Sequence, residues 1–585
     1  MVNLDRNLVL PETDLPNIDE LLGEGELLGN DINLGSCPFL TLHDIDSESE
    51  YKRLCSSEGK IMLHGQIGYR NFAKTKLAYS KIHNQIEAAG YQVDRYGICL
   101  DWSMGYPASL RANMPKGTGL ILNNQQKFID LTHSAPVAPH FGDFVIGTPA
   151  AVENTVAALQ AGSTSIGNIG QYFTFRLPKW DDDVKTTAET VKAITLCANQ
   201  PIPIMIHSNL DDGFAALFCD MSCSIGAVLL EQYIIEDLLS GHVSHCYGHT
   251  FSDPLTRLAF QKALYKVSRT PGSMVYGNTT IFVANKVENY ANLASYLLVD
   301  IIAQRNSPTG HGLNPVPVTE AMRIPEIEEI IDAHLFANRL ILRADGYLDL
   351  FDMTVVEKTA NILVDAGKRF KRQILKGLDE IGIDIKNPFE LLLVIRRIGA
   401  KTLEELFGPG EPQEDQIRSR RPVVQATPIV ELEKRSDEIV LGLEQEEVSQ
   451  MKFKICVACT DVHEYGKILV EEVLKKLNYE IIDAGVSVDP DLVVQRAKKT
   501  GADFIAISTY NGIALSYLQA LNHEMKRLDL DVPIFVGGKL NQIPDDSPTS
   551  LPVDVTEELK KLGATVCYQV EDMLGNLYKI AKERK

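Results

Sequence analysis

Short apolar runs alternate with amphipathic stretches along most of this 585-residue chain, and this alternation limits the folds that it can adopt. From about Lys60 the apolar runs include KIMLHGQIG, YGICLDW, GTGLIL, PIPIMIHS and MVYGNTTIF, and helical patterns such as NTVAALQAG and ANLASYLLVDIIAQ follow several of them. Buried strands that alternate with helices form parallel β/α units. We therefore predict an α/β fold with a (β/α)8 TIM-like barrel over residues 41–407, mostly helical in its last part, after an acidic N-terminal arm over residues 1–40.

The composition changes after residue 407. Residues 408–450 are rich in Gly, Pro and mixed charge with weak periodicity, which is typical of a linker. Five apolar runs then alternate with helical patterns over residues 451–585, and they are FKICVACT, YEIIDAG, ADFIAIST, VPIFVGG and ATVCYQ. This pattern predicts a doubly wound, Rossmann-like (flavodoxin-like) sheet. Such sheets bind ligands beyond the carboxyl ends of their strands.

The segment after the first of these five strands carries the spacing Asp-x-His-x-x-Gly, in the sequence TDVHEYG. An imidazole on such a loop can coordinate a metal, and a ligating histidine normally gives its other N–H to a carboxylate. Asp461 can accept that hydrogen bond from His463, and Gly466 leaves room for a bulky group beside the backbone. Small or hydroxyl residues at the ends of the third and fourth strands would open a slot along the sheet. The predicted ligand site comprises Thr460, Asp461, Val462, His463, Gly466, Ser508, Tyr510, Gly537 and Gly538.

Taken together, Asp461-x-His463-x-x-Gly466, Ser508 and Gly537-Gly538 resemble the cobalamin-binding domain of corrinoid mutases and methyltransferases, over the whole of residues 451–585. The resemblance implies that the dimethylbenzimidazole tail of the cofactor leaves cobalt and enters the slot, and that His463 replaces it as the lower axial ligand. One departure is that the usual Ser-x-Leu of the family is Ser508-Thr509-Tyr510 in this chain.

The barrel region resembles a second set of proteins. Gly147-Thr148-Pro149, the following AALQAGSTSIGNIGQYFTFRLPKW, and KIMLHGQIG resemble the barrel subunit of glutamate mutase. The stretch around Asn278-Thr279 and Glu288-Asn289-Tyr290, ending at Thr309-Gly310-His311-Gly312, resembles lysine aminomutase barrels. A barrel and a cobalamin domain in one chain resemble 2-methyleneglutarate mutase. These likenesses imply an isomerase that uses adenosylcobalamin for a radical 1,2 carbon-skeleton rearrangement of a small carboxylic acid, such as a 2-methyleneglutarate- or glutamate-like diacid.

In glutamate mutase, arginines hold the two carboxylates of the substrate, as bidentate Arg–carboxylate pairing allows. This chain departs from that pattern, because Gln66 stands where one family arginine would align and no arginine directly precedes Gly147. The candidate substrate-binding residues are Gln66, Arg70, Arg111, Arg176 and His207.

Two other cobalamin chemistries and one binding role stay open. An aminomutase would need pyridoxal phosphate and a Schiff-base lysine, and Lys467 and Lys539 are close to the motif in sequence. A corrinoid methyltransferase usually has a compact helical bundle directly before its cobalamin domain, where this chain has the charged segment 408–450. A cobalamin sensor would be the non-enzymatic alternative.

Charge and composition bear on partners and compartment. The net charge of −21 and the lack of a basic run argue against nucleic-acid binding. The sequence contains no uninterrupted run of about 18 or more apolar residues, so we predict no transmembrane helix. The ten cysteines form no disulfide framework pattern, so we expect reduced thiols in a cytoplasmic protein. Cys456 and Cys459 lie three apart in one predicted strand, on opposite faces, which favours core positions over a zinc or redox site. We also expect a homo-oligomer, either a dimer or a tetramer.

Overall fold

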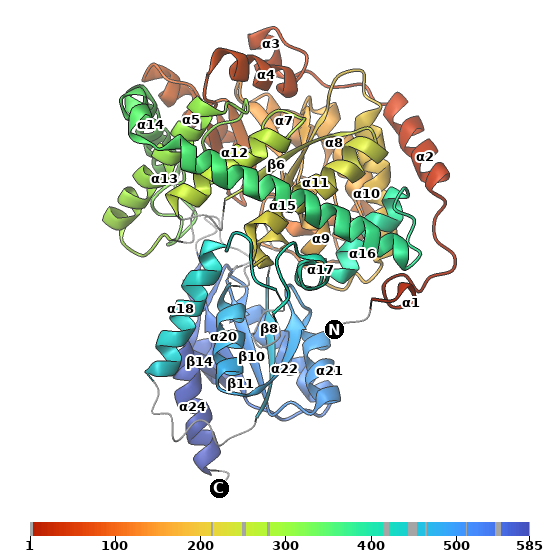
Figure 1. Ribbon diagram of the computed structural model, residues 1–585, viewed down its shortest axis with the longest axis vertical. Coiled ribbons are helices and arrows are strands. Elements are labelled where there is room, and N and C mark those ends of the chain that lie inside the picture. Colours follow the sequence, from red (N-terminus) through yellow and green to blue (C-terminus); the bar gives the residue numbers. More distant parts are fainter. Residues whose placement is uncertain are drawn as a thin grey trace. The chain divides into compact units, whose positions relative to one another are not determined.

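The computed structural model forms two compact units (Figure 1). One unit comprises Met1–Leu177 and Asp182–Thr427, and the other comprises Pro178–Asp181 and Pro428–Lys585. The residues that the structure describes are 4–211, 214–248, 253–277, 281–413, 420–442, 453–461, 465–510, 512–544 and 552–583. No helix in these ranges combines the length and apolarity that a bilayer span requires.

A parallel sheet whose strands follow one another in chain order forms the centre of the first unit. Its seven strands in the described residues are β1 (His64–Ile67), β2 (Arg95–Ile98), β3 (Ala138–Phe141), β4 (Ser165–Ile166), β5 (Met205–Asn209), β6 (His242–Tyr247) and β7 (Met274–Val275). The helices that follow them are α5 (Phe72–Ala88), α6 (Ala108–Arg111), α7 (Gln125–Thr132), α8 (Ala151–Gln160), α9 (Gln171–Thr174), α10 (Asp183–Ala198), α11 (Met221–Gln232), α12 (Pro254–Val267) and α13 (Lys286–Asn306). Because each strand pairs in parallel with the next one along the chain, the sheet curls in one direction.

The predicted full barrel is not confirmed, because the described residues contain seven regular strands of this sheet and no eighth. The segment 309–313 nevertheless hydrogen bonds near both edges of the sheet. The amide of Gly272, just before β7, donates to the Thr309 carbonyl at 2.7 Å, and the amide of His64 in β1 donates to the Leu313 carbonyl at 2.8 Å. The confirmed architecture is therefore a curled half-barrel, and its closure by a regular eighth strand stays a prediction.

Asn and Asp side chains begin most of the helices that follow the strands. Each of these side chains accepts a hydrogen bond from a backbone N–H in the first helical turn, which satisfies a donor that the helix itself leaves free. The capping residues are Asn71 for α5, Asn124 for α7, Asp182 for α10, Asp220 for α11, Asp253 for α12 and Asn285 for α13. The polar turns seen in the sequence thus fix where each helix starts.

Further helices cover the first unit. They are α1 (Arg6–Val9), α2 (Ile18–Asn30), α3 (Pro38–His43) and α4 (Glu48–Glu58) before the sheet, and α14 (Ile327–Ala344), α15 (Met353–Glu380), α16 (Pro388–Ile398) and α17 (Ala400–Phe407) after it. The long helix α15 crosses α11 (Figure 1), and the two backbones approach closely. A Cβ atom added at Gly226 would lie 2.9 Å from the Gly367 carbonyl oxygen, so only glycine fits at this crossing.

The second unit is a five-stranded parallel sheet in the order β14-β11-β10-β8-β9. Its strands are β8 (Lys454–Cys459), β9 (Glu480–Gly485), β10 (Phe504–Thr509), β11 (Ile534–Gly538) and β14 (Ala564–Cys567), and its helices are α18 (Thr427–Leu441), α20 (Tyr465–Lys476), α21 (Pro490–Thr500), α22 (Ala514–Arg527), α23 (Thr556–Lys561) and α24 (Val570–Glu583). The first strand lies between the second and third, which is the flavodoxin-like order. The predicted doubly wound fold is confirmed.

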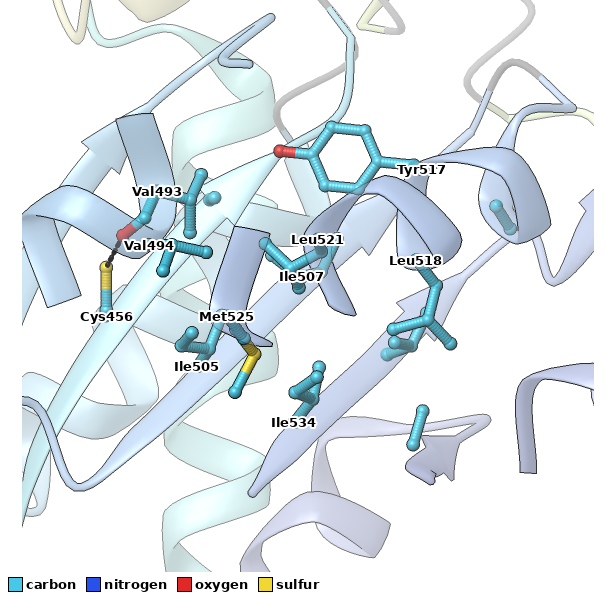
Figure 2. Packing of buried hydrophobic residues seen from close by; sticks show 14 of the residues in the cluster. Cys456, Val493, Val494, Ile505, Ile507, Tyr517, Leu518, Leu521, Met525 and Ile534 are labelled. Carbon is cyan, nitrogen blue, oxygen red and sulfur yellow. Dashed lines mark hydrogen bonds between the residues drawn. The ribbon is translucent and has the colours of Figure 1, made fainter. Parts of the chain in front are cut away.

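Apolar residues cover both faces of this sheet. Cys456 packs with residues of α21 and α22 on one face (Figure 2), whereas its neighbour Val457 packs with Val473 and Leu574 on the other. Cys456 and Cys459 are both buried and outside any disulfide, and their odd spacing along the strand puts them on opposite faces. The prediction that they are core cysteines is confirmed.

The segment 408–450, expected to be a linker, contains ordered structure. Its first part hydrogen bonds to the first unit, where the amides of Met221 and Ala426 donate to the carbonyls of Val424 and Cys219 at 2.8 and 2.9 Å. Its second part is helix α18, which buries Leu432 and Ile439. The apolar positions of α18 are spaced as in a helix, but dense charge between them weakens the pattern in the sequence.

Candidate functional site

The carboxyl ends of β8, β10 and β11 meet at one edge of the second unit. In the parallel register Ser508 lies opposite Cys459 on one side and opposite Gly537 on the other. Strand β8 is also where the order of the sheet reverses, because β9 and β10 flank it on either side. Open α/β sheets bind ligands at such a reversal.

A cavity of about 290 Å³ lies beside these strand ends, between the sheet and α18, α20 and α24. Ligand pockets usually measure roughly 300–1,000 Å³, so its size suits a compact ring system or one part of a larger ligand. The structure brings four of the predicted ligand residues to its wall, and these are Gly466, Ser508, Gly537 and Gly538. The other side chains that line it include Ile439, Val457, Val470, Ala506, Phe535 and Met573. The lining is therefore mainly apolar, with the hydroxyl residues Ser508 and Tyr568 and a few charged or amide side chains among it.

Glycines keep this cavity open. A Cβ atom added at Gly466 would lie 2.8 Å from the Ser508 Oγ, and one added at Gly537 would lie 3.1 Å from the Cys567 carbonyl oxygen. Gly538 has a φ of +93°, and a Cβ there would lie 2.2 Å from the Thr509 carbonyl oxygen. Any larger residue at these positions would narrow the slot or strain the backbone. A flat apolar group fits this cradle, as a dimethylbenzimidazole tail requires.

Asp461 is held firmly at the end of β8. Its Oδ2 accepts hydrogen bonds from the Thr460 hydroxyl at 3.0 Å and from the Tyr510 amide at 3.1 Å. The Thr460 amide in turn donates to the Ser508 carbonyl at 3.0 Å, which ties this turn to β10. A carboxylate fixed in this way can orient a nearby imidazole. Val462 and His463 lie outside the described residues, so the axial-ligand role of His463 stays a prediction.

Tyr510, at the position where the sequence departs from the family, is 44% exposed. It does not line the cavity wall described above. Its backbone amide is the group that contacts Asp461. The Tyr510 side chain therefore does not fill the slot.

The interior of the curled sheet in the first unit is unusually polar. Four buried histidines gather there from β1, β3, β5 and the segment after α13, and they are His64, His140, His207 and His311. The rings of His140 and His207 lie 4.7 Å apart, and those of His64 and His311 stack at 5.6 Å. Burial lowers the pKa of all four well below the usual range, and Arg95 lowers it further in all four. Lys52 also lowers the pKa of His64, His207 and His311. At neutral pH these imidazoles are therefore uncharged.

Two cations share one carboxylate next to these rings. Glu48 Oε1 lies 3.0 Å from Lys52 Nζ and 2.9 Å from Arg95 Nε, and all three side chains are at most 2% exposed. Lys52 Nζ lies 2.7 Å from His311 Nδ1, which leaves the proton of that ring on Nε2. Within the described residues this buried Nε2 has no hydrogen-bond partner. An excess of positive charge beside a donor without an acceptor favours an anion.

Gln66 contacts one of these buried histidines. It is exposed, although the other residues of β1 are buried. Its Oε1 lies 3.1 Å from His64 Nε2, and His64 Nδ1 lies 3.2 Å from Arg95 Nη1. A Cβ atom at Gly97 would come within 2.1 Å of the same Gln66 oxygen, so glycine there makes room for this side chain. Gln66 is thus an exposed side chain that contacts His64, and His64 in turn contacts the buried Arg95.

The other proposed substrate residues are placed differently. His207 lies among the buried histidines, with its Nδ1 3.8 Å from the Cys246 Sγ. Arg70 donates to the Gly117 carbonyl at 2.6 Å, Arg111 donates to the Met104 carbonyl at 2.9 Å, and Arg176 donates to the Arg396 carbonyl at 3.4 Å. The structure therefore places Gln66 and His207 beside or within the polar interior. The three arginines instead donate hydrogen bonds to backbone carbonyls. Substrate binding by any of the five stays a prediction.

Comparison with known proteins bears on the second unit. Residues 453–550 match the family described as B12 binding domain. The second unit carries a B12-binding domain. A solved structure, described as a novel cobalamin-binding protein from Desulfitobacterium hafniense DCB-2, is similar at 19% identity, covering 26% of this chain and 70% of that one with a TM-score of 0.20. The family match includes β8, β10 and β11, whose carboxyl ends border the cavity.

Several residues of both regions were not predicted from the sequence. In the B12-binding domain, Arg435 of α18 and Glu571 of α24 line the cavity. In the first unit, Lys52 and Arg95 carry the charge of the polar interior. One signal could have found Arg95, because it is a charged residue within the apolar run of the second strand, YQVDRYGICL. A charge at such a position needs a buried partner.

Proposed function

We propose that this chain is an adenosylcobalamin-dependent mutase that performs a 1,2 carbon-skeleton rearrangement of a small carboxylic acid, such as a 2-methyleneglutarate- or glutamate-like diacid. The observation that carries the proposal is the presence of a B12-binding domain and a half-barrel with a cationic, histidine-rich interior in one chain. Bound adenosylcobalamin supplies a carbon radical when its cobalt–carbon bond is cleaved. The protein's own part is to hold the cofactor, bind the acid and keep water away from the reacting groups.

Each unit has a distinct part in this proposal. In the B12-binding domain, the cavity beside Ser508 would hold the nucleotide tail, and His463 would hold cobalt, with Asp461 as the carboxylate that could orient its imidazole. In the first unit, Lys52 and Arg95 provide the positive potential that attracts a carboxylate, and the uncharged imidazoles provide hydrogen bonds without adding charge. An acid that enters beside Gln66 would meet these donors.

The pyridoxal-phosphate alternative requires an unprotonated lysine that can form a Schiff base. Lys467 is 4% exposed and forms ion pairs with Glu471 at 2.7 Å and Asp483 at 2.8 Å. Burial lowers its pKa, but the two carboxylates more than offset burial, so its pKa lies above the usual value. Lys467 therefore stays protonated, and this disfavours its use as a Schiff-base lysine.

Anaerobic electron paramagnetic resonance with adenosylcobalamin and a panel of five-carbon diacids tests the proposal. A mutase gives a paramagnetic cobalt–radical signal with at least one diacid, and the signal is absent without substrate. An absorbance band of an aldimine on adding pyridoxal phosphate would point to an aminomutase instead. Silence with every acid, together with methyl transfer from methylcobalamin, would refute the mutase assignment and favour a corrinoid methyltransferase.

A further inference from the structure

Helix α18 forms one wall of the cavity in the B12-binding domain, although it precedes the residues that match the family. Its Ile439 packs in the same apolar cluster as Val457 of β8 and Phe535 of β11. Lys476 of α20 also holds α18 against the domain, because its Nζ donates a hydrogen bond to the Ser436 hydroxyl at 2.7 Å. The helix is therefore built into the domain, and residues on its inner side face the cavity.

Arg435 is the residue of α18 that brings charge to this wall. Its guanidinium lies 2.6 Å from Glu571 Oε1 at the start of α24, and both residues line the cavity. The two side chains are 43% and 37% exposed. The second carboxylate oxygen, Glu571 Oε2, is buried and has no hydrogen-bond partner within the described residues. Ion pairs at this exposure are weak, so Arg435 can exchange Glu571 for a better anionic partner at little cost.

The other cation on the cavity wall, Lys467, already forms ion pairs with two carboxylates. Lys467 is 4% exposed and is neutralised by Glu471 and Asp483. Most of the remaining lining is apolar. A ligand with an apolar ring in the slot and an anionic group at its mouth would therefore meet Arg435. The planar guanidinium suits a phosphate, which it can bind with two parallel hydrogen bonds.

We propose that Arg435 binds the phosphodiester of the cobalamin nucleotide tail, and that Glu571 holds the guanidinium in place when the tail is absent. The inference rests on the cobalamin-binding part of the proposed function and is independent of the reaction. It makes α18 a part of the cofactor site. It also gives the domain a means of distinguishing complete cobalamins from corrinoids that lack the nucleotide.

Binding titrations on the full chain test this role, with cyanocobalamin and with cobinamide, a corrinoid without the nucleotide tail. Arg435→Gln should weaken cyanocobalamin binding about tenfold, the usual effect of losing a charge-assisted hydrogen bond, and should leave cobinamide binding unchanged. Glu571→Gln should tighten cyanocobalamin binding, because it releases Arg435 from its competing partner.

Arg527→Gln is the matched control. Arg527 forms an ion pair with Glu524 at the same 2.6 Å and is 53% exposed, but it lies on α22 and does not line the cavity. This variant should bind both corrinoids as the natural chain does.

Three results would overturn the proposal. They are unchanged cyanocobalamin binding in Arg435→Gln, an equal loss of cyanocobalamin and cobinamide binding, and a natural chain that binds neither corrinoid. The third would also remove the cobalamin assignment itself. Normal corrinoid binding without a radical signal for any acid would refute only the mutase reaction. Should Arg435→Gln fail to fold, Glu571→Gln and Arg435→Lys decide the question. Arg435→Lys keeps the charge but lacks the planar guanidinium, so it should bind cyanocobalamin more weakly than the natural chain and cobinamide equally well, and unchanged cyanocobalamin binding in both variants would overturn the proposal.

Discussion

The absence of a side chain at Gly466 sets the width of the cavity beside β10. A Cβ atom at Gly466 would lie 2.8 Å from the Ser508 Oγ, in the space that the dimethylbenzimidazole ring of a bound tail would need. Gly466→Val would fill part of the slot, so we expect cobalamin affinity to fall about tenfold to a hundredfold, as overpacking costs about 1–3 kcal/mol. Equilibrium dialysis with cyanocobalamin measures this change.

Gly575→Val provides the control for that variant. Gly575 lies on α24, and no atom lies within 4 Å of its Cβ position. The same substitution there should leave cobalamin affinity unchanged. Equal loss of affinity in both variants would mean that the Gly466 effect arises from helix destabilisation and not from the slot.

His334 gives the first unit a measurable response to acid. Burial lowers its pKa from 6.5 to about 4. Because the folded state binds the proton more weakly than the unfolded state, the stability that neutral His334 contributes is complete above pH 6.5 and is lost as the pH falls toward 4. His334→Gln should therefore reduce the loss of unfolding free energy between pH 7.5 and pH 5 by about 2 kcal/mol.

Urea unfolding at the two pH values measures this difference. The buried histidines of the polar interior add to the loss in both proteins, so the comparison between the two proteins isolates His334. His523→Gln on the exposed side of α22 should keep the full pH response. The same response in His334→Gln and the natural chain would contradict the assignment of this effect to burial.

Sequence spacing located the residues at strand ends but not the charges in the interior. Ser508 and Gly537 could be predicted, because apolar runs mark where parallel strands end and such ends meet at one edge. Lys52 could not be predicted, because it lies on a helix before the sheet and its partner His311 is distant in the sequence. Such a pair depends on how the sheet curls, which local patterns do not specify.

At the level of elements, the crossing of α11 and α15 depends on close contact between two glycines. A Cβ at Gly226 would lie 2.6 Å from Phe370 and 2.9 Å from the Gly367 carbonyl oxygen. Gly226→Val should therefore lower the unfolding free energy by about 1–3 kcal/mol, because the helices must separate. Gly23→Val on α2, where the Cβ position has no neighbour within 4 Å, should cost clearly less in the same denaturation experiment. Equal losses would contradict a role for helix proximity.

Elements with a clear apolar period could be predicted, and elements without one could not. The five strands of the B12-binding domain correspond to five apolar runs of the sequence. Helix α18 was expected to be part of a linker, because charged residues separate Leu432 from Ile439 and it has a narrow apolar face. An eighth strand in the first unit was predicted from the alternation of apolar runs and helical patterns over residues 41–407, whereas the segment 309–313 supplies hydrogen bonds rather than a regular strand.

For the molecule as a whole, the proposed cofactor site and the proposed substrate site belong to different units. The second unit holds the apolar cavity and the B12-binding domain, and the first holds the cationic interior. The sequence predicted the class of both units from strand and helix alternation. The expected dimer or tetramer and the cytoplasmic location stay predictions, because they depend on surfaces and partners that a single chain does not contain.

Coordination of cobalt by His463 is the central claim, and electron paramagnetic resonance of bound cob(II)alamin tests it directly. The chain is prepared once with ordinary histidine and once with histidine labelled with nitrogen-15. If the imidazole of His463 is the lower ligand, the label changes each nitrogen-split line from a triplet to a doublet, and His463→Ala abolishes this effect. Triplets that persist with labelled histidine would show that the dimethylbenzimidazole nitrogen still binds cobalt, and would contradict the account.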